Sequence, residues 1–302
     1  MEINDVSIFY NKISGLATLA NENALPDLER LLLSLQLWNE ELPTVYLACT
    51  SGLEKKLPDI LKKLHYTGNV KTNTCLDSYE GLRRPDMERA PSKQGYPNLW
   101  FDFMLEKTHL IDWALEEQKG VLFCDADICW LSQLPEIPVN KTLGVSPHRI
   151  RQHDEEKYGV YNGGFLWTNS KAHMELWREK TKTSRFFEQM SIQDVVASLP
   201  KEDVYVFDTQ YNYGWWRMFQ SSRTPEEQKI YWSVFRSATD ETNSGIRVEN
   251  KPLACIHTHF SDTQDIITVR FNKFVIEKLE LLANQKTHKA QKKIKTLLKY
   301  IK

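Results

Sequence analysis

The chain has 302 residues, of which 41% are hydrophobic, so it can form one large domain or two small ones around a substantial core. Its formal net charge of −1 argues against a general affinity for nucleic acid. No apolar run approaches the ~18 residues of a membrane-spanning helix, and the acidic segment 1–5 lacks the basic and apolar regions of a signal peptide. The 5 cysteines include no CxxC pair, which argues against a disulfide framework or a zinc cluster. We therefore expect a soluble, cytoplasmic protein that does not bind nucleic acid.

Strand-like segments alternate with helical patterns in the first part of the chain. The expected strands cover residues 14–20, 44–49 and 68–72. The expected helices cover residues 26–35, with Pro26 in the first turn, and 57–64. This β-α-β-α-β order predicts a parallel sheet with right-handed crossovers.

An apolar run at residues 120–124 ends on two acids, Asp125 and Asp127. Before it, residues 80–98 predict a loop over the sheet edge, and residues 99–115 predict a helix. Such a run is typical of a strand buried on both faces, and its carboxyl end lies where open α/β sheets bind ligands. Because side chains alternate along a strand, we expect the two carboxylates on the same side.

Two carboxylates held close together repel each other unless a proton or a cation lies between them. Near neutral pH, in contact with water, a divalent cation is the more favourable partner, and oxygen ligands suit Mg²⁺ or Mn²⁺. The alternative is that Asp125 caps a turn while Asp127 faces solvent. The motif alone does not decide between these interpretations.

Two adjacent glycines, Gly163 and Gly164, stand near the head of a later apolar strand. A strand at 143–146 and a polar loop at 148–158 are expected before that strand, which covers residues 161–167. Glycine weakens a strand, so the pair needs a reason. It fits a backbone that approaches a bound ligand closely, or alternatively a β-bulge or a tight turn.

The next segments combine polar and aromatic residues. Residues 172–180 predict a helix, and Gln193 and Asp194 are expected in the first turn of another short helix. A strand at 204–208 leads to the aromatic segment 211–216. Its rings can form a platform for a sugar or a base, or they can belong to the core.

The last strand-like run, 253–259, ends in His257 and His259, which are expected on one face. A histidine pair at a strand end is a candidate for metal binding, although a strand histidine is also common as a hydrogen-bonded core residue.

From Ile276 the chain is expected to be helical, and we divide it into a domain, 1–280, and a basic amphipathic helical tail, 281–302. The apolar face of the tail consists of Ile294, Leu297, Leu298 and Ile301. Lysines cover the opposite face. Such a tail can lie on an anionic membrane surface, or it can dock on the body of the protein with its lysines in water.

Taken in order, these features resemble the GT-A fold of nucleotide-sugar glycosyltransferases, in the branch of glycogenin-like and bacterial galactosyltransferase-like enzymes. The resemblance covers roughly residues 15–260. The matching segments are residues 19–21, 34–35, 106–107, 122–127, 161–165, 193–194, 211–212 and 257–259. It implies an α/β fold in which helices flank a mixed, mainly parallel, Rossmann-like sheet, as a single domain with a C-terminal helical tail.

The resemblance also implies roles for individual residues. The donor-binding residues it implies are Ala20 and Asn21 near the base and ribose, Lys107 at the diphosphate, Asp125, Ala126 and Asp127 at the ribose and diphosphate, and Asn162, Gly163 and Gly164 at the sugar. Asp125, Asp127 and one histidine would hold Mn²⁺ or Mg²⁺, with His257 preferred and His259 in reserve. Gln193 and Asp194 would lie at the reacting carbon.

The activity implied is a metal-dependent transfer of a sugar from a nucleotide-diphosphate sugar, with UDP as the expected nucleotide. The acceptor is a hydroxyl of a glycan, a protein or a lipid-linked molecule, and retention of configuration is favoured. The cation and Lys107 would stabilise the charge on the leaving diphosphate, and Gln193 and Asp194 the oxocarbenium-like sugar.

One position departs from the family pattern, because many relatives have an acid directly before the glutamine and Ile192 stands there instead. This leaves a non-catalytic sugar- or nucleotide-binding protein of the same fold as an alternative. A phosphatase of the haloacid dehalogenase type is a weaker one, since its Asp-x-Asp lies near the N-terminus and its downstream acidic element is absent here.

Overall fold

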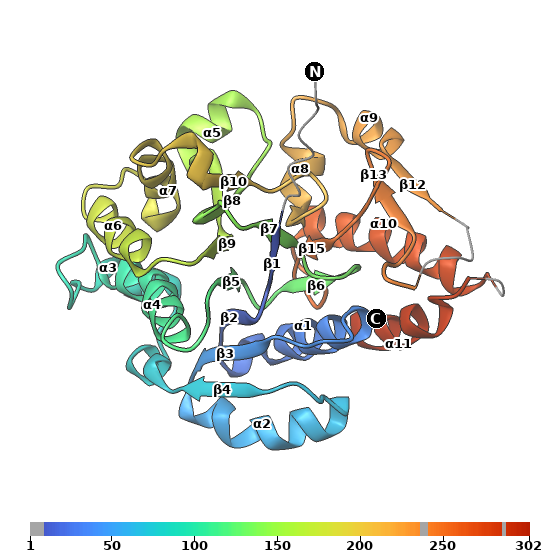
Figure 1. The fold of residues 1–302 in the computed structure, drawn as a ribbon, viewed down its shortest axis with the longest axis horizontal. Helices are drawn as coiled ribbons and strands as arrows, with labels where there is room; N and C mark the ends of the chain where they lie inside the picture. The colour runs from blue at the N-terminus through green and yellow to red at the C-terminus, as the bar shows by residue number, and fades with distance from the viewer. Residues whose placement is uncertain (1–8, 236–240, 286–287) are drawn as a thin grey trace.

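A seven-stranded sheet runs through the centre of the computed structural model, which describes residues 9–235, 241–285 and 288–302 (Figure 1). The strand order is β10-β8-β9-β5-β2-β3-β4. These strands are β2 (Gly15–Ala20), β3 (Thr44–Cys49), β4 (Val70–Asn73), β5 (Val121–Cys124), β8 (Leu143–Pro147), β9 (Tyr161–Thr168) and β10 (Val204–Val206). All neighbours are parallel except where β9 runs antiparallel to β5 and β8. The expected mixed, mainly parallel sheet is confirmed.

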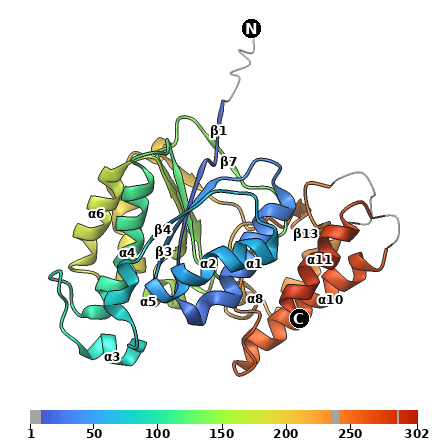
Figure 2. The same ribbon diagram turned by 90° about the horizontal axis from the view of Figure 1, so that it is seen from below.

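Helices cover both faces of this sheet (Figures 1 and 2). One face carries α4 (Leu99–Ala114), α6 (Lys171–Thr181) and α7 (Phe187–Ala197), and the other carries α1 (Leu25–Trp38), α2 (Ser51–Leu64), α10 (Ile266–Ala283) and α11 (Gln291–Ile301). Alternate residues of β5 enter opposite cores: Leu122 packs on the α1 side and Phe123 on the α4 side, both fully buried. The apolar run before Asp125 is therefore a strand buried on both faces, as predicted.

The order of the strands places a topological switch point between β2 and β5. From β2 the chain adds β3 and β4 on one side, and it then returns to add β5 on the other side of β2. Open α/β sheets bind ligands outside the carboxyl ends of the strands at such a point. In this chain those ends lead into Asn21 after β2 and into Asp125 after β5.

A smaller sheet of three strands, in the order β11-β15-β6, brings distant segments together. Its strands are β11 (Tyr213–Gly214), β15 (Cys255–His257) and β6 (Ile128–Trp130). In the register, His257 lies opposite Ile128 on one side and Gly214 on the other. This sheet therefore fixes His257 beside the turn that contains the two aspartates.

Shorter elements complete the fold. The strands among them are β1 (Tyr10–Lys12), β7 (Glu136–Pro138), β12 (Trp232–Val234), β13 (Ile246–Val248) and β14 (Lys251–Pro252). The helices are α8 (Trp215–Phe219) and α9 (Pro225–Ile230), with 3₁₀ turns at Glu22–Ala24, Cys75–Tyr79 and Lys201–Asp203.

Two segments expected as loops contain short helices, α3 (Arg84–Arg89) and α5 (Gln152–Tyr158). Polar contacts in their first turns stabilise them rather than an apolar face, which is why the apolar pattern did not reveal them. The Asp86 carboxylate accepts a hydrogen bond from the Arg83 backbone N–H at 3.2 Å, and at the start of α5 Arg151 Nε donates to the Asp154 carboxylate at 3.0 Å.

The C-terminal region forms two helices, not the single helix expected from Ile276 onward. The first, α10, begins earlier, at Ile266, where the Asp265 carboxylate accepts a hydrogen bond from Thr268 N at 2.8 Å. Between the helices, the Gln291 side-chain amide donates to the carbonyl of Ala283 at 2.8 Å. It satisfies a backbone group near the end of α10.

Helix α11 packs with its apolar face on the rest of the protein. Ile294, Leu297, Leu298 and Ile301 are buried in the same core as the leucines of α1. Lys292, Lys295 and Lys299 remain exposed. Of the two alternatives for this segment, the structure has the docked one. No helix in the described part of the chain combines the length and the apolar character needed to span a membrane.

Candidate metal centre

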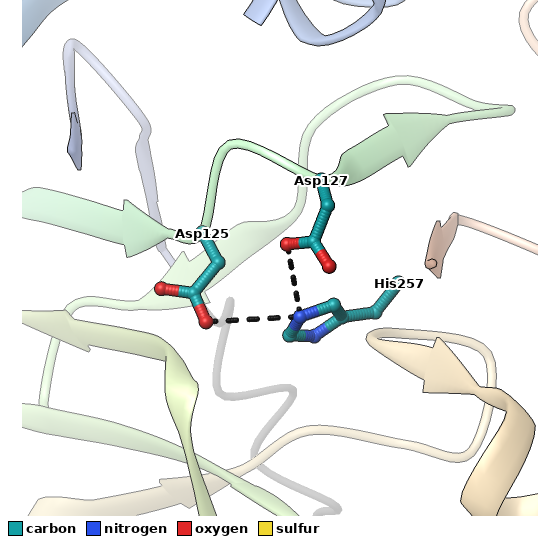
Figure 3. A group of neighbouring side chains, drawn as sticks. All are labelled: Asp125, Asp127 and His257. Carbon is teal, nitrogen blue, oxygen red and sulfur yellow. Dashed lines mark ion pairs between the residues drawn. The ribbon is translucent and has the colours of Figure 1, made fainter. Parts of the chain in front are cut away.

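Asp125 and Asp127 lie in a tight turn between β5 and β6. The Ile128 backbone N–H donates to the carbonyl of Asp125 at 3.1 Å, which closes the turn. Strand alternation, the reason given for placing the carboxylates side by side, is therefore wrong, because the strand ends at Cys124. The carboxylates still converge, since the turn directs both toward His257 (Figure 3).

Three side chains form a compact group of potential metal ligands: Asp125, Asp127 and His257. Their ligand atoms all lie within 4.8 Å of one another. His257 Nε2 is 3.1 Å from Asp127 Oδ1 and 3.7 Å from Asp125 Oδ2. Only 11% of the Asp127 side chain is exposed, so the alternative in which it faces solvent is wrong.

Hydrogen bonds to Asn212 fix the orientation of His257. The amide nitrogen of Asn212 donates to Ser146 Oγ and to Asn162 Oδ1, both at 3.1 Å, so its oxygen is the atom that faces His257. That oxygen lies 2.7 Å from His257 Nδ1 and accepts its proton. Nε2 is thereby turned toward the two carboxylates, as in histidines that bind metals.

The glycine pair lets β9 approach Asp125 and His257 closely. Since β9 is antiparallel to β5, its first residues lie at the carboxyl end of β5, and the Asp125 N–H donates to the carbonyl of Gly164 at 2.9 Å. A Cβ atom on Gly164 would lie 2.2 Å from Asp125 Oδ2 and 2.8 Å from His257 Cε1. Neither glycine has a positive φ, so a turn that needs one does not explain them. The register of β9 against β8 is irregular between Leu166 and Tyr161, so the β-bulge alternative applies here together with the close approach.

A buried ion pair contacts the backbone of Gly163. Lys107 Nζ lies 2.8 Å from Glu188 Oε1 and donates to the carbonyl of Gly163 at 3.2 Å, and both charged side chains are only 2% exposed. The next residue, Gln189, accepts a hydrogen bond from the Gly163 N–H at 3.1 Å. Glu188 and Gln189 were not among the predicted site residues, although they have the order, an acid directly before a glutamine, that the family pattern has and that positions 192–193 lack.

Gln193 and Asp194 lie in the second half of α7, so their expected place in its first turn is wrong. Asp194 is exposed, whereas Ile192 is 1% exposed and packs in the core beside Leu166. Earlier in α7, Glu188 accepts a hydrogen bond from Lys107, and Gln189 accepts one from the Gly163 N–H. A catalytic role for Gln193 and Asp194 stays a prediction.

His259 lies at the rim of the group, outside the three-residue set. Its Nδ1 is 2.8 Å from Asp27 Oδ2, its Nε2 is 3.6 Å from Asp127 Oδ2, and 62% of its side chain is exposed. The preference for His257 over His259 agrees with this geometry. Asp27 was missed, because an acid in the first turn of a helix normally needs no further explanation.

The charges in the group are interdependent. Burial raises the pKa of Asp125 above its usual range. Burial acts in the same direction on Asp127, but the charge of His257, its hydrogen bond and the charge of His259 together outweigh burial and lower the pKa of Asp127. Burial would lower the pKa of His257, but the carboxylates of Asp127 and Asp125 raise it. A hydrogen bond to Asp27 raises the pKa of His259 to about 9.

The donor set fits a divalent cation. Two carboxylate oxygens and one imidazole nitrogen are ligands that Mn²⁺ accepts readily, and Mg²⁺ accepts the oxygens. With metal–oxygen bonds of about 2.1 Å, opposite ligands are separated by about 4.2 Å. The observed spread, within 4.8 Å, needs only small adjustments to match this.

A separate cavity of about 220 Å³ lies at the carboxyl ends of β2 and β3. Asn21, Thr50 and Tyr79 are among the residues that line it. Ala20 is buried at the end of β2, and Ala126 is buried in the turn between the aspartates. These are the positions expected near the nucleotide, at the edge of the sheet that also carries Asp125.

The aromatic segment divides between core and site. Tyr213 is 1% exposed and belongs to the core. The half-buried Trp216 presents its ring to His257, with ring centroids 5.0 Å apart and planes at 80°. The core alternative therefore holds for Tyr213, and a platform for a sugar or a base stays a prediction for the half-buried rings.

No protein-family model and no curated protein sequence matches the chain, but solved structures do. The apo structure of the bifunctional glycosyltransferase WbbM superposes with a TM-score of 0.52 at 10% identity, covering 95% of this chain and 52% of that one. The glycosyltransferase GlyE of Streptococcus pneumoniae TIGR4 gives a TM-score of 0.49 at 14% identity, covering 90% of this chain and 62% of that one. The apo structure of mouse xyloside xylosyltransferase 1 gives a TM-score of 0.44 at 14% identity, covering 68% of this chain and 90% of that one. The likeness to WbbM shows that the chain has the GT-A-type fold.

Proposed function

We propose that this protein is a metal-dependent glycosyltransferase that moves a sugar from a nucleotide-diphosphate sugar, with UDP as the nucleotide, to an acceptor hydroxyl. The observation that carries the proposal is the Asp125–Asp127–His257 group at the carboxyl edge of a GT-A-type sheet. This edge is where open α/β sheets bind their ligands. We place the protein in the cytoplasm, with a glycan, a protein or a lipid-linked molecule as acceptor.

In this proposal Asp125, Asp127 and His257 hold Mn²⁺ or Mg²⁺. A divalent cation there would offset the negative charge that develops on the diphosphate leaving group. Asn212 keeps Nε2 of His257 directed at the carboxylates, because it accepts the Nδ1 proton at 2.7 Å. Gly164 leaves Asp125 the space it needs, since any side chain at that position would overlap the carboxylate.

We assign the 220 Å³ cavity beside Asn21 to the nucleoside, with Ala20 and Ala126 along the way to the metal centre. Asn162, Gly163 and Gly164 would border the donor sugar. Lys107 would act on that part of the site indirectly, through the Gly163 backbone, because its ammonium group is buried against Glu188 and the Gly163 carbonyl. A direct contact between Lys107 and the diphosphate would require this ion pair to open.

At the reacting carbon we keep Gln193 and Asp194 as candidates and add Glu188 and Gln189. Two contacts support the added pair. Gln189 accepts a hydrogen bond from the Gly163 N–H at 3.1 Å, and Glu188 lies 2.8 Å from Lys107, which itself donates to the Gly163 carbonyl. A carboxylate or amide beside the sugar stabilises its oxocarbenium-like character. Retention of configuration is the outcome we expect.

The test is donor hydrolysis and transfer by purified protein. UDP-glucose, UDP-galactose, UDP-N-acetylglucosamine and GDP-mannose are incubated with Mn²⁺, and nucleotide diphosphate release is measured. We expect release from one donor, reduced at least about 100-fold in Asp127→Asn. The matched control is Asp208→Asn, which changes an exposed aspartate that pairs with Lys251 at the surface. Equal release by the wild type and Asp127→Asn would contradict the proposal.

A non-catalytic binding protein of the same fold is the second candidate. The burial of Ile192 in the core favours it, because no acid precedes Gln193. The same assay separates the two: metal-dependent binding of a nucleotide sugar with neither hydrolysis nor transfer would identify the binding protein.

A further inference from the structure

The two oxygens of Asp127 face two different imidazole rings. Oδ1 is 3.1 Å from Nε2 of His257, and Oδ2 is 3.6 Å from Nε2 of His259. The His259 side chain is 62% exposed, and an exposed ring at a rim normally has rotational freedom. A ring with this exposure needs a second contact to keep Nε2 beside Asp127.

Asp27 provides that contact. Its Oδ2 lies 2.8 Å from Nδ1 of His259, and its other oxygen accepts a hydrogen bond from Arg30 Nη2 at 2.5 Å. Only 9% of the Asp27 side chain and 6% of the Arg30 side chain are exposed. Because both oxygens of Asp27 are engaged and the pair is buried, the carboxylate cannot turn without losing one partner.

We propose that Asp27 and His259 are positioning residues of the metal centre. Asp27 accepts the Nδ1 proton of His259, which turns Nε2 toward Oδ2 of Asp127. With the His259 ring beside Oδ2, at 3.6 Å, the carboxylate has less room to turn, so Oδ1 stays directed at the space beside His257. The inference rests on the proposed metal centre, and it adds an outer layer of support that helix α1 supplies. Mutation of a residue that supports a metal ligand in this way typically weakens metal binding by about 10- to 100-fold.

The same contacts connect the metal centre to the C-terminal helix. Arg30 Nη1 donates to the carbonyl of Tyr300 in the last turn of α11 at 3.2 Å. The chain of contacts therefore runs from Tyr300 through Arg30, Asp27 and His259 to Asp127. Figures 1 and 2 show α11 lying along α1, the helix that carries Asp27 and Arg30.

A purely structural role for the pair makes a different prediction. The loop after β15 is also tied to α10, because Asn272 Nδ2 donates to the carbonyl of His259 at 2.9 Å and Asn272 Oδ1 accepts from the Thr258 hydroxyl at 2.7 Å. If Asp27 only fastened this loop to α1, its loss would lower stability and leave metal affinity unchanged.

The experiment measures Mn²⁺ binding by calorimetry on the full chain, and unfolding by urea in EDTA. His259→Asn is the sharpest variant, because its amide nitrogen can replace Nδ1 toward Asp27 but cannot reach Asp127. His259→Ala and Asp27→Asn accompany it, and the exposure of His259 makes its variants tolerable for folding. Asn272→Ala is the matched control, since it loosens the same loop and leaves the ring alone.

We expect all three site variants to bind Mn²⁺ about 10- to 100-fold more weakly, and Asn272→Ala to bind within about threefold of the wild type. Wild-type affinity in His259→Asn and His259→Ala, with binding abolished in His257→Ala, would overturn this inference and leave the proposed metal centre intact. No Mn²⁺ binding by the wild type would overturn both.

Discussion

The Nδ1 atom of His257 lies 2.7 Å from the side-chain oxygen of Asn212, a residue 45 positions earlier in the chain. Asn212 has a positive φ of 54°, a conformation that asparagine tolerates better than most residues, and it is fully buried. The contact continues through Asn162 to His148, which gives its Nδ1 proton to the carbonyl of Gly159 at 2.9 Å. Each donor and acceptor in this series of hydrogen bonds determines the next, and Nε2 is therefore the nitrogen of His257 that faces the aspartates.

Replacing Asn212 by glycine removes the acceptor for His257 and keeps a residue that tolerates the positive φ. We expect Mn²⁺ affinity to fall by about 10- to 100-fold, because the ring loses the partner that orients it. Calorimetry measures the affinity. The control is Ser146→Ala, which removes another partner of Asn212 but leaves the oxygen facing His257. An unchanged affinity in Asn212→Gly would show that the bond does not orient the ring.

Gly164→Ala tests the close approach of β9 to the metal centre. The new methyl group would meet Asp125 Oδ2 at 2.2 Å and His257 Cε1 at 2.8 Å, so two ligands must move. We expect metal binding to fall at least about 100-fold, since ligand geometry is lost directly. In the control, Gly68→Ala, the methyl group meets only the Tyr66 side chain. Normal Mn²⁺ binding by Gly164→Ala would contradict the geometry described here.

The buried Lys107–Glu188 pair predicts strong coupling in a double-mutant cycle. Lys107→Met leaves Glu188 buried without its partner and should lower the free energy of unfolding by about 3–5 kcal/mol. Lys107→Met with Glu188→Leu should lose clearly less than the sum of the single changes, because no unpaired charge remains. Urea unfolding measures all three.

The exposed Lys251–Asp208 pair is the control for this cycle, with side chains 62% and 54% exposed. Lys251→Met should change stability by less than about 1 kcal/mol. Additive losses at Lys107 and Glu188 would mean that the two charges do not stabilise each other.

His148 predicts a pH dependence of stability. Burial lowers the pKa of His148 from 6.5 to about 4. Between these values the unfolded chain binds a proton that the folded chain does not, so stability falls as the pH falls through this window. The contribution is about 3 kcal/mol. Urea unfolding at neutral pH and near pH 4 gives the loss in the free energy of unfolding between the two pH values. This loss should be about 3 kcal/mol smaller in His148→Gln than in the wild type. Equal losses would rule out this contribution.

The sequence predicted the sheet and the ligand group because both depend on local pattern. The apolar run before Asp125 is a buried strand, the two aspartates follow its end, and His257 is the last residue of another short strand. The adjacency of His257 and Asp127 depends on the register of β15 against β6, which no local pattern contains. The expectation of convergence was right, but the reason given for the aspartates was wrong, since a turn joins them.

What the sequence did not predict are contacts between distant residues. Asp27 and His259 are 232 positions apart, and Lys107 and Glu188 are 81 positions apart. Glu188 and Asp27 carry no distinguishing pattern, because acids near helix starts are common. Helices α3 and α5 were missed for a related reason: they are short, and polar contacts in the first turn stabilise them instead of an apolar face.

The most direct test of the account is a calorimetric titration of UDP and GDP into the protein, with Mn²⁺ and with EDTA. Wild type is compared with Asp127→Asn and with the surface control Asp208→Asn. We predict that one nucleotide binds to the wild type and to the control only when Mn²⁺ is present, and that Asp127→Asn does not bind it. Equal binding in EDTA, or no binding of either nucleotide under both conditions, would contradict the proposed metal-dependent nucleotide-sugar site.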